Sequence, residues 1–110
     1  MMNVSPVKAA ASNQTGEARF ACSQSMGHIS ERGEMIVRAI RLDEFPTPDL
    51  IKMDIEGGEI DAVPGAARIL SERRTIWFIA LHNSEACLRA FRSPGYRLQI
   101  VDGHALATPI

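Results

Sequence analysis

The segment Leu50–Ile55 constrains the fold of this chain more than any other part of the sequence. It is short, mostly apolar on both faces, and followed closely by Gly57 and Gly58. A strand with two apolar faces is typical of a parallel sheet that is covered by other layers. Because parallel strands need a crossover between them, residues 59–74 are expected to form a crossover helix, broken at Pro64–Gly65.

The segments on either side complete an α/β pattern. Residues 76–81 are predicted to form a second buried strand, and Ser84 is a suitable N-cap for a short helix after it. Residues 96–101 and 105–110 flank an Asp-Gly turn and predict a terminal hairpin. Upstream, residues 23–33 are expected to form a polar connection. The remaining segments with strand character are residues 7–11, 18–22 and 35–40.

Length and composition bound the class of protein. The 110 residues are enough for a single domain, residues 1–110, and the formal net charge is -1. Basic and acidic residues are interspersed, so we expect neither a nucleic-acid nor a membrane partner. No run approaches the roughly 18 apolar residues of a membrane span, and no signal peptide is recognised, so the expected compartment is the cytoplasm.

The two cysteines, Cys22 and Cys87, are far apart in sequence and neither belongs to a Cys-x-x-Cys motif. Zinc ligation is therefore not expected. In a cytoplasmic chain such cysteines are typically reduced, and we expect no disulfide.

Polar side chains follow the two strongest strands. Asp54 and Glu56 lie at or just beyond the end of the first, and His82 directly follows the second. Ligands of parallel sheets bind at the carboxyl ends of strands, so these side chains are candidate catalytic residues if the strands are neighbours. Gly57 and Gly58 would let the backbone approach a ligand closely.

Each candidate also has a structural alternative. Asp54 can cap the backbone of the next turn or pair with Lys52, which shares its face of the strand. His82 can orient a loop instead of taking a proton. Glu59 is favourable at a helix N-terminus because of the helix dipole. The acidic residues could also bind Mg²⁺, although their spacing is a weak metal signal and no metal is expected.

The amino-acid sequence of Pro48–Glu59 closely resembles the signature of FkbM-type methyltransferases, which is an "LIKxDxEGxE" strand and turn. In that family the signature precedes a helix with a "GA" step, which resembles Gly65–Ala66 here. Three weaker pieces match in order, and the resemblance covers roughly residues 7–103. These pieces are the "LDD"-like Leu42–Phe45, the strand and turn Ala9–Phe20, and Gly95–Tyr96.

The resemblance implies a fold as well as a cofactor. It implies a partial class I methyltransferase (Rossmann-like) α/β sheet, mostly parallel, with a C-terminal antiparallel hairpin. The earliest matching segment corresponds to the third strand of the family, so the first two strands are missing. Residues 7–11 would then pair with a new partner, for example Leu50–Ile55, or be held loosely.

The activity implied by the resemblance is S-adenosylmethionine-dependent methylation of a hydroxyl, often on a sugar or small molecule. Asp54 and Glu56 would lie near the methyl group and the acceptor, with Asp54 also near the cofactor. Ser12 and Asn13 would end the strand next to the adenine. Without the Gly-rich segment that binds the donor, this chain is expected to be inactive alone. The alternative is a non-catalytic remnant that binds a partner or self-associates through unpaired strand edges.

Overall fold

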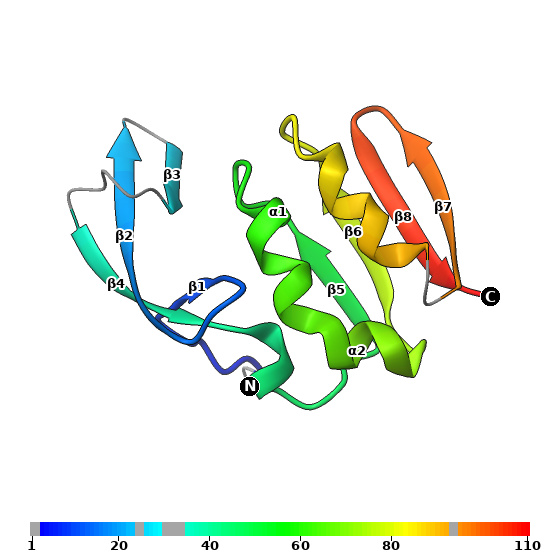
Figure 1. Ribbon diagram of the computed structural model, residues 1–110, viewed down its shortest axis with the longest axis horizontal. Helices are drawn as coiled ribbons and strands as arrows, with labels where there is room; N and C mark the ends of the chain where they lie inside the picture. Colours follow the sequence, from blue (N-terminus) through cyan, green and yellow to red (C-terminus); the bar gives the residue numbers. More distant parts are fainter. Residues whose placement is uncertain (1–2, 24–25, 30–34, 93–94) are drawn as a thin grey trace.

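The computed structural model describes residues 3–23, 26–29, 35–92 and 95–110. Its strands form two separate four-stranded sheets that lie beside each other (Figure 1). We call the sheet formed by β1–β4 the first sheet and the one formed by β5–β8 the second sheet.

The first sheet has the strand order β1-β4-β2-β3. Its strands are β1 (Ala10–Ala11), β2 (Gly16–Ser23), β3 (Met26–Ile29) and β4 (Met35–Ile40). β1 pairs with β4 in parallel, and the other two pairings are antiparallel. The strand expected near residues 7–11 therefore pairs with β4 and not with Leu50–Ile55. The connection expected over residues 23–33 contains β3 in its described part.

The second sheet has the order β5-β6-β8-β7. It consists of β5 (Leu50–Met53), β6 (Ile76–Ala80), β7 (Tyr96–Val101) and β8 (His104–Pro109). β5 and β6 are parallel, as expected, and β7 and β8 form the expected antiparallel hairpin. β6 also pairs with β8 in antiparallel fashion. Both sheets are thus mixed, and the expectation of a mostly parallel sheet is wrong because each sheet has one parallel and two antiparallel pairings among the described residues.

The crossover between β5 and β6 is helical but interrupted. It comprises α1 (Glu59–Ala62), the 3-10 helix η2 (Pro64–Ala66) and α2 (Ala67–Glu72). Pro64 lacks the N–H that a continuous helix needs, which explains the break. Two further 3-10 helices are η1 (Leu42–Glu44) and η3 (Glu85–Phe91).

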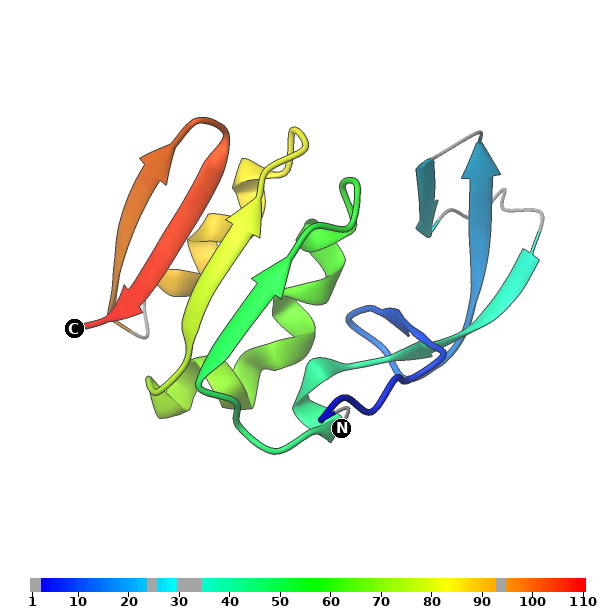
Figure 2. The ribbon, with the colours of Figure 1, turned by 180° about the vertical axis from the view of Figure 1, so that it is seen from behind.

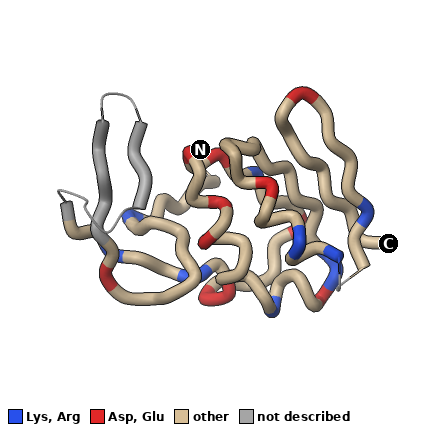
Figure 3. Tube along the Cα trace, turned by 45° about the horizontal axis from the view of Figure 1, so that its top comes forward, with Lys and Arg blue, Asp and Glu red and all other residues tan. Residues whose placement is uncertain are grey.

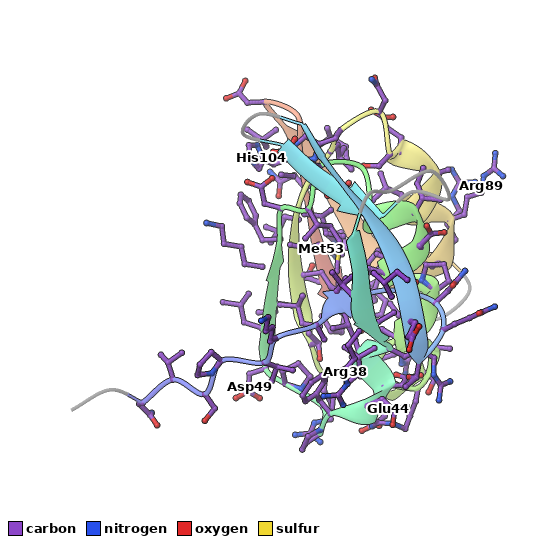
Figure 4. The ribbon with its side chains drawn as sticks, turned by 90° about the vertical axis from the view of Figure 1, so that its left-hand side faces the viewer. Arg38, Glu44, Asp49, Met53, Arg89 and His104 are labelled. Carbon is purple, nitrogen blue, oxygen red and sulfur yellow. The ribbon has the colours of Figure 1, made fainter. Side chains whose placement is uncertain are left out.

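The hydrophobic core lies between the second sheet and its helices. Met53 of β5 is buried there (Figure 4), together with Trp77 of β6. The Trp77 and Phe91 rings stack edge to face with centroids 5.3 Å apart, and Phe91 and Tyr96 do the same at 5.3 Å. Such pairs add to the free energy of area burial because the ring edges and faces carry opposite partial charge.

The described helices cover one face of the second sheet, and Figure 2 shows the other face from behind without a helix over it. A doubly wound sheet carries helices on both faces, so membership of a Rossmann-like sheet stays a prediction. We call the uncovered side the open face. Leu50 and Phe78 on it are 61% and 37% exposed, and Phe78 stacks on His104 with ring centroids 5.1 Å apart.

The two sheets are joined through the crossover. Both carboxylate oxygens of Asp43 in η1 accept backbone hydrogen bonds at the start of α2, from Arg68 at 2.8 Å and Ile69 at 3.1 Å. Gly65 of η2 approaches the backbone of Ser12 so closely that a Cβ on this glycine would lie 2.2 Å from the Ser12 carbonyl oxygen. The contact therefore requires glycine at position 65.

Charges of both signs are interspersed along the tube in Figure 3. None of the helices in the described part of the chain combines the length and apolar character that a membrane crossing requires. The cytoplasmic compartment and the absence of nucleic-acid and membrane partners stay predictions. Cys87 is a buried free thiol, whereas the side chain of Cys22 lies outside the described part of the structure.

Candidate active site at the ends of β5 and β6

The parallel pairing of β5 and β6 brings the ends of the two strands to one edge of the second sheet. Met53 is paired with Ile79, so the loops that follow these strands leave the sheet side by side (Figure 1). Asp54 and Glu56 belong to the first loop and His82 to the second. The structure therefore brings together the three side chains that the sequence singled out as catalytic candidates.

The imidazole of His82 lies between carboxylates. Its Nε2 atom is 3.3 Å from Asp54 Oδ1 and 3.6 Å from Glu56 Oε2. The three side chains are 30%, 56% and 33% exposed in the order His82, Asp54, Glu56. The cluster is thus open to solvent and accessible to a small molecule.

A third carboxylate lies beneath the cluster. Glu59, the first residue of α1, is completely buried, and its Oε2 atom is 3.4 Å from Nδ1 of His82. The same oxygen accepts the backbone N–H of Ile55 at 2.8 Å, and Oε1 accepts that of Gly57 at 3.1 Å. Glu59 therefore shapes the loop after β5 as well as facing His82.

Both loops contain a non-glycine residue in the left-handed backbone region. The φ angles are 54° at Glu56 and 55° at Asn83. In residues other than glycine such conformations cost about 1–3 kcal/mol each, and they cluster at functional sites. Gly57 has a φ of 98°, and a Cβ there would lie 3.9 Å from the carbonyl oxygen of His82, so the two loops lie against each other.

Ser84 plays a different role from the one expected. It is the residue before η3, but its side chain caps no helical N–H. Its buried hydroxyl instead accepts the backbone N–H of His82 at 3.0 Å. Ser84 thus fixes the loop that carries His82.

The structural alternatives for Asp54 are resolved in part. The side chain found within 4 Å of the Asp54 carboxylate is the His82 ring rather than Lys52 of β5. Ligand atoms of Asp54, Glu56 and His82 all lie within 4.8 Å of one another, a spacing that a single divalent cation could bridge. Exposed carboxylates commonly share such spacings without an ion, so this geometry alone assigns no metal.

Ser12 and Asn13, the residues expected next to the cofactor's adenine, are not part of this cluster. They line a polar pocket of about 220 Å³ together with residues 14–18 and Ala39. Ser12 is buried, and its hydroxyl lies 3.4 Å from the side-chain oxygen of Asn13. The candidates therefore fall into two places, one at each sheet.

The sequence interpretation did not include Glu59 in the site. A signal for its burial was nevertheless present, because Glu59 lies three and four positions before Ala62 and Val63, which are both fully buried. Residues with this spacing share one helix face. Helical periodicity could therefore have indicated a buried position for Glu59, but not the groups that its carboxylate contacts.

Comparison with known proteins adds the family. Residues 4–98 match the family described as the Methyltransferase FkbM domain. The chain is also similar to the crystal structure of Methyltransferase FkbM from Methylobacillus flagellatus KT, at 26% sequence identity and a TM-score of 0.50. That similarity covers 66% of this chain and 23% of the other, so the chain spans less than a quarter of that protein's length. No curated protein matches the chain. Because the family match extends over most of the sequence, the chain belongs to the FkbM methyltransferase family.

Proposed function

We propose that this chain carries the acceptor side of an S-adenosylmethionine-dependent O-methyltransferase site, with a sugar or another small hydroxyl compound as the acceptor. The observation that carries the proposal is the meeting of Asp54, Glu56 and His82 at one sheet edge, with contacts of 3.3 and 3.6 Å. Membership of the family supports methyl transfer as the reaction.

The described residues fit the charged sulfur of the donor, with its methyl group, better than they fit the whole donor molecule. S-adenosylmethionine supplies an electrophilic methyl group on a positively charged sulfur. Asp54 and Glu56 suit a cation, because their negative charges attract it. The pocket at Ser12 and Asn13 has a volume of about 220 Å³, whereas small-molecule sites begin at about 300 Å³. We therefore propose that this chain binds the donor weakly.

His82 and its neighbouring carboxylates would orient the acceptor hydroxyl and accept its proton. A hydroxyl that is methylated must lose its proton, and an imidazole or a carboxylate within hydrogen-bond reach can accept it. Asp54 and Glu56 are acceptor-only groups when ionised, so they can hold the hydroxyl in one orientation. Positioning of this kind is a large part of the rate enhancement in a two-substrate transfer.

Titration of the ¹⁵N-labelled chain with S-adenosylmethionine, which carries the positively charged sulfur, tests the proposal by NMR. We expect amide shifts at Asp54–Gly58, His82 and Ser12–Asn13, with a Kd of about 1 mM or weaker. Asp54→Asn should abolish the shifts in the first two segments. The matched control is Asp49→Asn, which lies at the opposite end of β5 and is exposed.

Two results would count against the proposal. Micromolar binding would show that the donor site is far more complete than its geometry indicates. Absence of shifts at any accessible concentration would leave the chain without a donor site.

A second candidate function is a non-catalytic module that binds a partner or dimerises. The open face of the second sheet favours it, because apolar side chains such as Leu50 and Ile76 are 61% and 40% exposed there. Exposed apolar surface of this kind is typical of interaction sites. The two candidates are separable, since association does not depend on Asp54 or His82.

A further inference from the structure

The placement of the proton on His82 follows from the burial of its neighbours. Nδ1 of His82 is buried and makes no hydrogen bond with the usual geometry among the described residues. The carboxylate nearest to it is that of Glu59, at 3.4 Å. Both oxygens of this carboxylate already accept backbone N–H groups, so Glu59 acts toward the ring as an acceptor.

A neutral imidazole carries one proton, and the two possible positions have different electrostatic costs. With the proton on Nε2, the lone pair of Nδ1 would face the fully buried carboxylate of Glu59. With the proton on Nδ1, the lone pair of Nε2 faces Asp54 and Glu56, whose side chains are 56% and 33% exposed.

The buried contact decides between these two arrangements. The repulsion energy between electron-rich atoms is inversely proportional to the effective dielectric constant, and water next to Asp54 and Glu56 raises that constant. Little such screening reaches Glu59, because none of its side chain is exposed. The arrangement with the proton on Nδ1 is therefore the more stable one.

We propose that Glu59 is a positioning residue that keeps the proton of neutral His82 on Nδ1, so that Nε2 is the nitrogen that gains and loses a proton. The functional part of this inference rests on the proposed methyl transfer. When the acceptor's O–H bond breaks, its electron pair stays on the oxygen that bonds the methyl carbon, and the proton passes to Nε2. The electron pair of the carbon–sulfur bond goes to the sulfur. The resulting imidazolium has three carboxylates within 4 Å, which stabilise its charge.

A proton held on Nδ1 of His82 has a spectroscopic signature that a merely structural role of Glu59 would not produce. The two ring nitrogens of a histidine have distinct ¹⁵N shifts that depend on which one is protonated, and long-range ¹H–¹⁵N correlation spectra of the labelled chain report them. His104 provides an internal reference, because its Nδ1 lies 2.9 Å from the carbonyl oxygen of Asp102 and must donate to it. At a pH where both rings are neutral, His82 should show the same Nδ1–H pattern as His104.

Substitution of Glu59 tests the cause. Glu59→Gln keeps the shape of the side chain but removes its negative charge, and an NH₂ donor at the Oε2 position can point at Nδ1 in exchange for the hydrogen bond from the Ile55 N–H. We expect His82 to shift toward the Nε2–H form, while His104 is unchanged. The matched control is Glu56→Gln, which removes a carboxylate near Nε2 and should leave the proton on Nδ1.

The inference is overturned if His82 of the unmodified chain shows the Nε2–H pattern, or if a folded Glu59→Gln variant keeps the Nδ1–H form. Should that variant fail to fold, the spectrum of the unmodified chain and the Glu56→Gln control still decide the point. The tautomer is observed without donor or acceptor. Failure of this inference is therefore distinguishable from failure of the donor titration, which tests the proposed function.

Discussion

Cys87 shows how the buried carboxylate of Glu59 acts on a neighbouring residue. The thiol is on η3, packed in the core, and its side chain is almost fully buried. Burial, with the negative charge of Glu59 as the next cause, raises the pKa of Cys87 from 9.0 to about 11. The folded chain therefore favours the neutral thiol, and this contribution to stability is lost as the pH rises from about 9 to about 11.

A thiol-labelling experiment checks this prediction. In a Cys22→Ser background at pH 8, Cys87 should react with a disulfide reagent at least about 100-fold more slowly than in the denatured chain, because two pKa units remove that share of thiolate. Glu59→Gln should recover part of the rate, since one source of negative charge is gone. Equal rates in the folded and denatured chain would contradict the raised pKa.

Single residues also show how far the sequence leads toward the site. Asp54, Glu56 and His82 could be predicted because they follow strands, and strands that pair in parallel end at the same edge. Glu59 was interpreted only as a favourable helix charge. Its contacts depend on the bend of the loop at Glu56 and Gly57, and such left-handed conformations leave no clear trace in an unaligned sequence.

Among the elements, α2 depends on a cap from outside its own sequence. No side chain next to the helix caps it, and Asp43 of η1 accepts the N–H groups of Arg68 and Ile69 instead. Carboxylates at a helix N-terminus stabilise it by filling free donors and by opposing the helix dipole. This contact links η1, which follows the first sheet, to the crossover of the second.

Removal of this cap should be measurable as a loss of stability. Asp43→Ala is expected to lower the free energy of unfolding by about 1–2 kcal/mol, and Asp43→Asn by less because one acceptor remains. Urea denaturation followed by circular dichroism measures the difference. Asp49→Ala, at an exposed acidic position, is the control and should change the free energy by less than about 0.5 kcal/mol. Similar losses for both alanine variants would argue against a capping role.

The elements themselves were predicted with uneven success, for physical reasons. The strand at residues 76–80 is a continuous apolar run, which is local enough to recognise, although the structure buries only one of its two faces. By contrast, β1 has only two residues, and its pairing with β4 is a tertiary choice. Strand partners with long sequence separation are fixed by packing, which explains why the first sheet could not be predicted.

At the scale of the whole molecule, the chain is slightly more extended than its length requires. Its radius of gyration is 14.0 Å, against about 13 Å expected for a compact chain of this length. The second sheet ends on one side in β5, which pairs only with β6 in the described structure. An edge strand next to an apolar open face is a template for further pairing.

We therefore expect the chain to self-associate as its concentration increases. Leu50→Lys places a charge on the edge strand β5, where Leu50 is 61% exposed, and should reduce the association measured by sedimentation velocity. Ile60→Lys is the matched control, because Ile60 is 43% exposed but belongs to α1. A chain that remains monomeric throughout the concentration range would exclude association through this edge.

The close approach of Gly65 to Ser12 has a consequence for unfolding. The contact joins main chain to main chain, and it has no rotamers that could adapt when one side begins to loosen. Partial opening of either sheet would thus break the contact between Gly65 and Ser12 completely instead of weakening it gradually. Heat should then melt the two sheets in a single cooperative step, even though each has its own hydrogen-bond ladder.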